Sequence, residues 1–319
     1  MKKINITFND KKYEFDEGIT LEEVSKKLYK GNFPALVGYV DNEIFSLDKK
    51  ILSDCTVKFV NLMDSEGNRI YQKGLFFVLA YAFKELFGYD YHVKTCHSID
   101  KAIKLRSNLN LTYDRINLLK AKMREIVDND MPIDKCLVSR KEAREYFLSI
   151  NDVSKADTFI YNTNHYITLY KLGDLYDYFF CNMPITAGVF KDFDLYLLDK
   201  GAFILQFPTI SDDGKIPEYV NREKIIEAFD ENYKLSKKLG IFNSSDINSA
   251  VASGKISDII KLTETISSNN LLNLAKEIYD KKDSVKIVLL AGPSSSAKTT
   301  TSRKLSMFLK SFGLNPKPI

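Results

Sequence analysis

The sequence contains no tryptophan and has little histidine and cysteine. Its 319 residues include three His and four Cys, the latter at positions 55, 96, 136 and 181. The cysteines lie far apart and form no C-x-x-C pair, which argues against a zinc finger or a disulfide-rich secreted scaffold. We therefore expect reduced thiols and a cytoplasmic protein.

Long apolar runs are also missing. No stretch approaches the roughly 18 uninterrupted apolar residues of a membrane-spanning helix, and the N-terminus lacks the apolar core of a secretory signal, so we expect no membrane partner. Lys and Arg number 46 against 42 Asp and Glu, a net charge of +4, which by itself does not indicate a nucleic-acid partner. A hydrophobic content of 45% over this length indicates two or three globular units.

A phosphate-loop pattern is present near the C-terminal end. Residues 285–291, VKIVLLA, form a short apolar run typical of a strand buried on both faces. Residues 292–299, GPSSSAKT, then have the spacing G-x-x-x-x-G-K-[ST], except that Ala297 takes the second glycine position. Apolar residues recur at helical spacing after the loop, at Leu305, Phe308, Leu309 and Phe312. The order strand, loop and helix predicts a phosphate-binding site.

Each position of this loop has an expected role. Backbone N–H groups and the positive end of the helix would surround the phosphates of ATP. Lys298 would bridge the terminal phosphates, and the Thr299 hydroxyl would bind Mg²⁺. Ala297 places a methyl group where the backbone needs a positive φ or a close approach to phosphate. The predicted nucleotide-binding residues are Gly292, Ser294, Ser295, Ser296, Ala297, Lys298, Thr299 and Thr300. The alternative is a serine-rich turn that binds nothing.

A nucleotide-binding domain also needs later strands, which carry a metal-binding carboxylate, an acceptor site and a lid. Only six residues follow the predicted helix and its Gly313 stop. We therefore expect residues 284–319 to be the incomplete start of a nucleoside kinase domain, with the catalytic base lying beyond Ile319 in a longer protein.

Residues 1–63 predict a β-grasp, ubiquitin-like unit. Apolar and polar residues alternate over 4–15, Thr20 and Glu23 form a capping box before a helix, and strand-like runs follow at 35–40, 43–46 and 56–62. This order resembles the TGS domain of threonyl-tRNA synthetases, certain GTPases and alarmone synthetases. The resemblance implies a role close to RNA or nucleotide metabolism.

Residues 64–215 resemble the second additional, or editing, domain of threonyl- and alanyl-tRNA synthetases. An apolar helix over 71–87 is similar to the synthetase helix that carries H-x-x-x-H, and DYFFCNM at 177–183 stands where those enzymes carry D-L-C-R-G-P-H. A helix over 113–130, a strand and helix over 136–148 and a hairpin over 167–177 continue this α/β architecture.

By that resemblance, the polar editing positions fall on Lys73, Phe77, Phe179 and Met183. Three of these side chains cannot act as acid, base or metal ligand. We therefore expect a degenerate editing site that binds no zinc and hydrolyses nothing. A metal site built from His92, His97, His165 and Cys181 is a weaker possibility, because no two of them have ligand spacing on one element.

Residues 216–283 predict a helical connector, with helices that include 256–266 and 270–279. The complete order resembles the bacterial multidomain uridine kinase-like proteins of the phosphoribulokinase and uridine kinase family, above all in AGPSSSAKTT at 291–300. This resemblance implies an α+β multidomain protein that transfers the γ-phosphoryl group of ATP, with Mg²⁺, to a nucleoside; the chain alone would be inactive. A noncatalytic RNA-binding or regulatory module is the alternative, and an aminoacyl-tRNA editing hydrolase is a third, disfavoured by the missing His and Cys.

Overall fold

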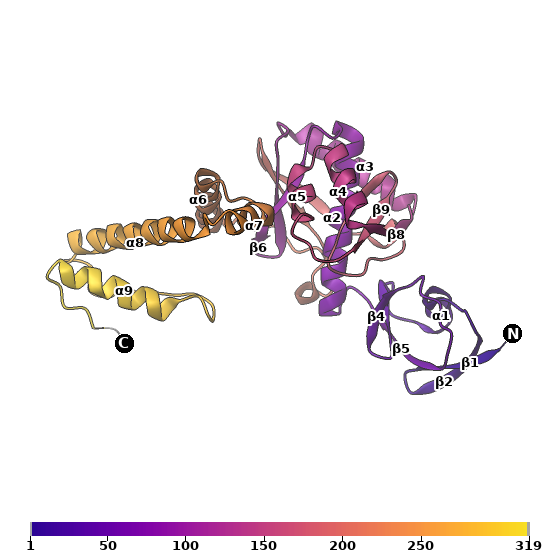
Figure 1. The fold of residues 1–319 in the computed structure, drawn as a ribbon. Coiled ribbons are helices and arrows are strands. Elements are labelled where there is room, and N and C mark those ends of the chain that lie inside the picture. The colour runs from indigo at the N-terminus through magenta and orange to yellow at the C-terminus, as the bar shows by residue number, and fades with distance from the viewer. Residues whose placement is uncertain (1, 318–319) are drawn as a thin grey trace. The chain divides into compact units, whose positions relative to one another are not determined.

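The computed structural model describes residues 2–317, which divide into two units that meet between Leu235 and Ser236. The first unit combines helices with three sheets, and the second is helical (Figure 1). The predicted α+β multidomain class is therefore confirmed. Within the described residues, no helix has the length and apolarity needed to cross a membrane.

The first sheet is a β-grasp arrangement with strand order β2-β1-β5-β3-β4. Its elements are β1 (Lys3–Phe8), β2 (Lys11–Asp16), α1 (Leu21–Leu28), β3 (Val37–Val40), β4 (Glu43–Ser46) and β5 (Cys55–Val60). Strand β1 pairs antiparallel with β2 and parallel with β5. The predicted capping box starts α1, because the Glu23 N–H donates to Thr20 Oγ1 and the Thr20 N–H donates to the Glu23 carboxylate.

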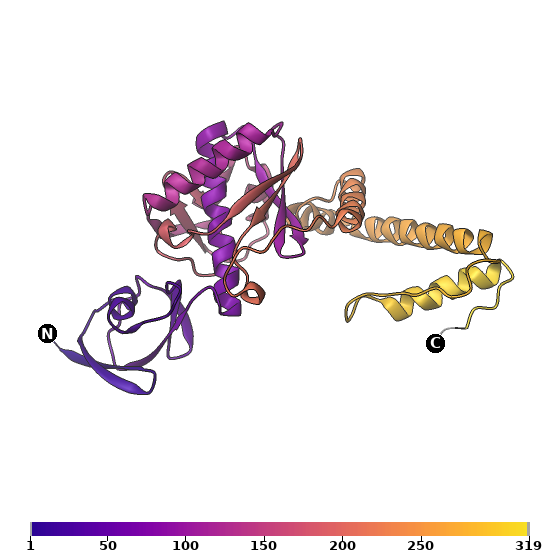
Figure 2. The same cartoon turned by 180° about the vertical axis from the view of Figure 1, so that it is seen from behind.

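The rest of the first unit is built around the long helix α2 (Ser65–Phe87), which can be followed in Figure 2. About half of the α2 residues are buried. One further sheet has the order β11-β12-β7-β6 and the other the order β10-β9-β8. The elements are β6 (Val93–Ile99), β7 (Ala102–Ser107), α3 (Tyr113–Asp128), β8 (Ile133–Ser139), α4 (Arg140–Ser149), α5 (Val153–Thr158), β9 (Tyr166–Leu172), β10 (Leu175–Asp177), β11 (Asp194–Asp199) and β12 (Ala202–Gln206). Apolar side chains of α2, α3 and both sheets share one core.

Strands β6, β7 and β11 were not predicted. Strand β7 carries Lys104 and Arg106 at alternating positions, which reads as a solvated face in the sequence. In the structure this face is covered, since Lys104 is only 1% exposed and pairs with Asp230 from a later helix. Because Asp230 is distant in sequence, the alternating pattern of β7 does not show that this face is covered.

Four helices follow the sheets: α6 (Glu223–Leu239), α7 (Ser244–Ala252), α8 (Ile256–Asp280) and α9 (Lys298–Ser311). The two helices predicted over 256–279 are one continuous helix, α8, because no glycine or proline interrupts them. Ala275 of α8 packs with Leu305 and Leu309 of α9 in a small core of the second unit.

The strand predicted over residues 285–291 is absent. Residues 285–290 make no strand pairing with any described segment, and Ile287 and Leu289 are 77% and 90% exposed. An apolar run forms a strand only when a neighbouring strand takes up its N–H and C=O groups. The predicted start of a kinase domain is thus present as a loop and a helix, without the sheet that would make it such a domain.

Candidate functional site

The predicted phosphate loop precedes α9 and is exposed. Ser295 and Ala297 both have positive φ, 59° and 58°, so the backbone is left-handed at two of its positions. Ala297 is also the residue at which the helix begins, and its carbonyl accepts the first helical bond from Thr301 at 2.9 Å. The expectation that Ala297 stands where a positive φ is needed is therefore confirmed.

Lys298 closes the loop on itself. Its Nζ donates to the carbonyl oxygen of Gly292 at 2.8 Å and also to that of Pro293. Gly292 cannot be larger without a shift, because an added Cβ would lie 2.7 Å from Ser296 Oγ. The loop therefore holds Lys298 and Gly292 together at the first turn of α9.

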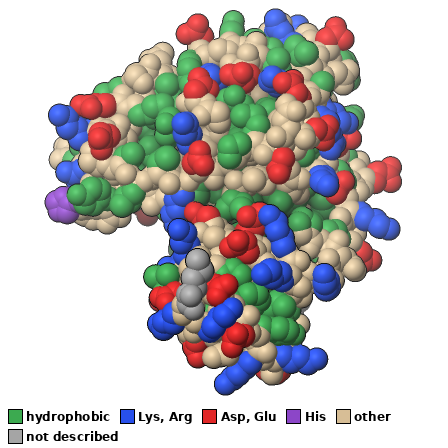
Figure 3. All heavy atoms as spheres, turned by 90° about the vertical axis from the view of Figure 1, so that its right-hand side faces the viewer, with side chains coloured by type: hydrophobic (Ala, Val, Ile, Leu, Met, Phe, Trp, Pro, Cys, Tyr) green, Lys and Arg blue, Asp and Glu red, His purple; other side chains and the backbone are tan. Residues whose placement is uncertain are grey.

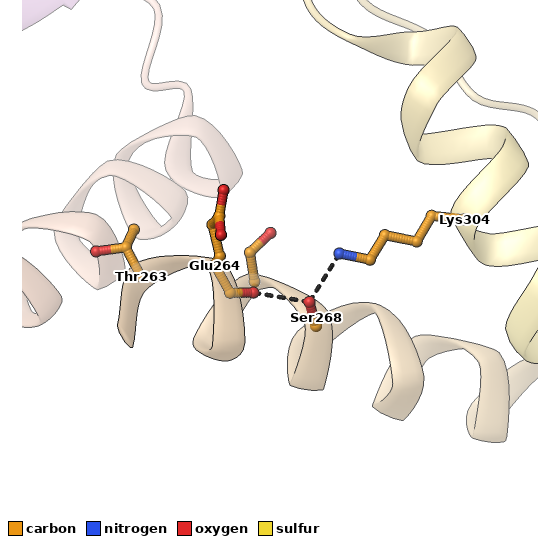
Figure 4. A pocket seen from close by; sticks show the side chains of 5 residues that line it. Thr263, Glu264, Ser268 and Lys304 are labelled. Carbon is orange, nitrogen blue, oxygen red and sulfur yellow. Dashed lines mark hydrogen bonds between the residues drawn. The ribbon is translucent and has the colours of Figure 1, made fainter. Parts of the chain in front are cut away.

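A polar groove lies between α8 and α9 of the second unit (Figure 4). Lys304 of α9 donates to Ser268 Oγ of α8 at 2.7 Å, and Ser268 itself donates to the carbonyl oxygen of Glu264. Thr263 and Ser267 complete its lining. These groups satisfy one another across the helix pair, so the groove is explained as a helix contact.

The predicted degenerate editing positions form an apolar cluster in the first unit. Phe77 of α2 is fully buried, Met183 is 1% exposed, and both belong to the main core. Phe179 packs edge-on against Phe77, with ring centroids 5.3 Å apart. Three of the four positions thus hold apolar side chains in contact with the core, where a hydrolytic site would need groups that orient a water.

Lys73, the fourth position, lies exposed on α2 one turn before Phe77. Its charge acts on the Cys181 thiol, whose pKa burial raises and Lys73 partly lowers. Tyr170 closes the side of this cluster, because its hydroxyl donates to the Cys181 carbonyl oxygen at 3.1 Å. Burial raises the pKa of Tyr170 to about 12, so this hydroxyl stays protonated.

The first unit also contains an ion pair that was not predicted from the sequence. Lys155 Nζ is 2.7 Å from Asp177 Oδ2, and the Asp177 side chain is only 8% exposed. Burial lowers the pKa of Lys155, but the Asp177 carboxylate outweighs it, so the net pKa lies above the usual value. Asp177 is also the first residue of DYFFCNM, the one position of that segment that keeps the carboxylate of the synthetase pattern.

The histidines do not assemble into a metal site. Among residues 2–317, no three His, Cys, Asp or Glu side chains are grouped so that they could hold a metal ion. His97 stacks instead on Phe229, with ring centroids 3.9 Å apart. On the face visible in Figure 3, basic and acidic side chains are interspersed and leave no large area of one sign.

Comparisons with known proteins place threonine–tRNA ligases among the relatives. The chain is 28% identical over 211 residues to the threonine–tRNA ligase of Thermotoga maritima, 30% over 205 residues to that of Sulfurihydrogenibium, and 28% over 247 residues to that of Finegoldia magna. These matches cover 60–72% of this chain and 31–38% of the relatives, so the chain spans about a third of their length. No protein-family model matches the chain.

The predicted function as a uridine or nucleoside kinase is contradicted by these relatives. The named proteins that it resembles are ligases that act on threonine and tRNA. The kinase interpretation depended on a strand that would begin a nucleotide-binding sheet, and residues 285–290 form no such strand. The comparisons support, instead, a region similar to threonyl-tRNA synthetase within an α+β chain.

Proposed function

We propose that the first unit is a threonine–tRNA ligase-like region that binds tRNA and does not hydrolyse the bond between a mischarged tRNA and its amino acid. The observation that carries this proposal is the match to threonine–tRNA ligases over 60–72% of the chain, combined with the apolar contents of the editing-like cluster. A match over 72% of the chain includes its central part, where Phe179 and Met183 lie. A tRNA partner also favours the cytoplasmic location expected from the sequence.

Lys73 is the group best placed to contact RNA at this site. It is exposed on α2 beside Cys181 and forms no ion pair with any described residue. A lysine without a carboxylate partner is free to neutralise a phosphate, and each such contact contributes to affinity and to its salt dependence. In this interpretation the cluster positions the RNA end without reacting with it.

The purified chain should bind tRNA specific for threonine with an affinity that falls as salt rises. Lys73→Ala should weaken binding about fivefold, because one phosphate contact is lost. For the same reason, the slope of the logarithm of the binding constant against the logarithm of the salt concentration should become shallower by about one. Lys141→Ala is the matched control, since Lys141 lies on α4 with a side chain 84% exposed and pairs only loosely with Glu145. Fluorescence titration with labelled tRNA gives both numbers.

The same protein should release no amino acid from mischarged threonine tRNA above the uncatalysed rate, because Phe77, Phe179 and Met183 cannot orient or deprotonate a water. Binding no stronger than to a DNA hairpin of equal charge would contradict the tRNA proposal. Measurable deacylation would contradict the assignment of the four editing positions.

We propose secondly that residues 292–300 bind the phosphates of a nucleotide such as ATP with Mg²⁺. The positive φ of Ser295 and Ala297 and the closure by Lys298 support this. Thr299 and Thr300 open α9, where unpaired N–H groups favour an anion.

Lys298→Ala should lower the affinity for MgATP at least tenfold in isothermal titration, because the only loop cation is removed. Ala297→Gly should raise the affinity severalfold, since glycine adopts a positive φ without the penalty that alanine carries. Lys310→Ala, in the last turn of the same helix, is the control and should change nothing. Equal affinities for wild type and Lys298→Ala would show that the segment is only a serine-rich turn.

A further inference from the structure

One face of the four-stranded sheet carries two cations beneath α6. Lys104 and Arg106 both point from β7 to Asp230 of α6, and both donate to the same oxygen, Asp230 Oδ1, at 2.7 and 2.8 Å. Lys104 is only 1% exposed. Burial raises the pKa of Asp230, but the two hydrogen bonds outweigh it and hold the carboxyl below its usual pKa. This carboxylate is therefore ionised.

Among the described residues, one carboxylate makes direct contact with both cations, and it does so through Oδ1 alone. Asp199 adds a longer-range attraction to Arg106. A buried cation is stable only when acceptors satisfy its donors. A phosphate would match the pair better than a carboxylate does, because it offers more acceptor oxygens and up to two charges, and because guanidinium and ammonium groups bind phosphate oxygens well.

A third polar group lies in the same layer without a partner. His97 of β6 is directly opposite Lys104 in the strand register, and its Nε2 is buried with no hydrogen-bond partner among the described residues. Burial, and then the charge of Lys104, lower the pKa of His97, so the ring is neutral at pH 7 and has a ring nitrogen available. A buried polar atom without a hydrogen-bond partner is uncommon in proteins, and a bound water or ion often supplies the missing partner.

Helix α6 covers Lys104 and Arg106 without burying any of its own residues. Phe229 and Tyr233 are still 42% and 41% exposed. The apolar contact beneath the helix is a small cluster in which Ile226 packs on Ile99, Ala102 and Ile204. Two ring contacts also hold α6: Phe229 stacks on His97 with centroids 3.9 Å apart, and Arg106 lies 4.9 Å from the centroid of the Tyr233 ring. Displacing α6 therefore exposes little buried apolar surface, but it breaks these contacts together with the Asp230 hydrogen bonds.

We propose that Lys104 and Arg106 form a phosphate-binding site that Asp230 occupies from α6 as an internal substitute for a phosphate oxygen. Entry of a phosphate group displaces Asp230 and releases α6 from the sheet. This site is independent of the editing-like cluster and of the loop before α9, so it does not rest on either proposed function.

Cys96 supplies a reporter for the release of α6. It lies on β6 next to His97, is partly buried, and has a pKa that burial raises and Arg106 partly lowers. When α6 leaves, the thiol becomes accessible and the rate of its alkylation rises. Peptide mass spectrometry separates Cys96 from Cys136 of β8, which serves as the internal control in the same digest.

Inorganic pyrophosphate at millimolar concentration should speed the alkylation of Cys96 at least fivefold and leave Cys136 unchanged. Sodium chloride at matched ionic strength should have little effect. A parallel sample with tRNA distinguishes the source of the phosphate: acceleration by tRNA alone assigns it to a nucleic acid backbone, and acceleration by pyrophosphate assigns it to a small ligand. Equal acceleration by sodium chloride, or none by either phosphate compound, would overturn the proposal.

Two variants separate a binding site from a structural ion pair. Asp230→Asn should raise the basal alkylation of Cys96 severalfold and tighten pyrophosphate binding about tenfold, because the internal competitor is weakened. Lys104→Met keeps the apolar stem and should abolish the response to pyrophosphate. Glu231→Gln, an exposed neighbour on α6, is the control. If Asp230→Asn frees α6 but calorimetry detects no pyrophosphate binding, the cluster is only structural.

Discussion

Replacing Lys155 by methionine should lower the free energy of unfolding of the first unit by about 3 kcal/mol, because a buried carboxylate loses its counter-ion. Among the described residues, the hydrogen bond from the Tyr178 N–H at 2.8 Å would be the one left to Asp177, whose side chain is 8% exposed. Lys155 Nζ also lies 5.4 Å from the centroid of the Phe147 ring, so the substitution removes a cation–π contact together with the ion pair, while methionine keeps an apolar side chain of similar length. Urea denaturation followed by circular dichroism gives the difference.

The effect of Lys155→Met should depend on pH in a defined direction. A buried carboxyl without a cation has a folded-state pKa above its unfolded value, because burial disfavours the charged form. The folded variant then binds more protons than its unfolded chain, so its stability rises as pH falls. The gap between variant and wild type should therefore shrink below about pH 5.

Asp174→Ala is the matched control for the ion pair. Asp174 lies 2.6 Å from Lys84 Nζ, but its side chain is 66% exposed, and Glu85 remains as a second partner for Lys84. An exposed pair contributes at most about 1 kcal/mol. A loss in Asp174→Ala as large as that in Lys155→Met would show that burial does not distinguish the two pairs.

Local sequence signals were sufficient to predict elements that are marked by a helix cap or by alternating apolar and polar residues. Thr20 with Glu23 predicted the beginning of α1, and alternating Ile4, Ile6 and Phe8 predicted a strand whose buried face the structure confirms. These features need no partner that is distant in sequence, because a capping box and a period of two are set within a few residues.

Features that depend on residues distant in sequence could not be predicted from such local signals. Strand β7 was not predicted, and its Lys104 pairs with Asp230, which lies 126 residues later in the sequence. The pair of Lys155 and Asp177 joins α5 to the end of β10 across 22 residues. For residues 285–290 the error was the reverse, since a strand was predicted and does not form. Their apolar composition favours a strand, yet no described segment pairs with them. Burial and pairing are properties of the assembled chain.

The editing-like cluster provides the sharpest test of whether its pocket is filled. Phe77 is fully buried and its ring packs against that of Phe179. Phe77→His restores the imidazole that the synthetase resemblance places there, but it removes apolar volume and buries a polar ring. We expect it to lower the free energy of unfolding by about 3 kcal/mol.

Phe77→Leu separates the two parts of that loss, because it changes volume and adds no polar atom. It should lower the free energy of unfolding by no more than about 1.5 kcal/mol. Zinc should leave the unfolding midpoint of Phe77→His unchanged, since Phe179 and Met183 provide no further ligand. If the histidine variant matches the leucine variant in stability, or if zinc raises its midpoint, polar groups or water reach position 77. The pocket would then be open, and the tRNA end would have a polar site to enter.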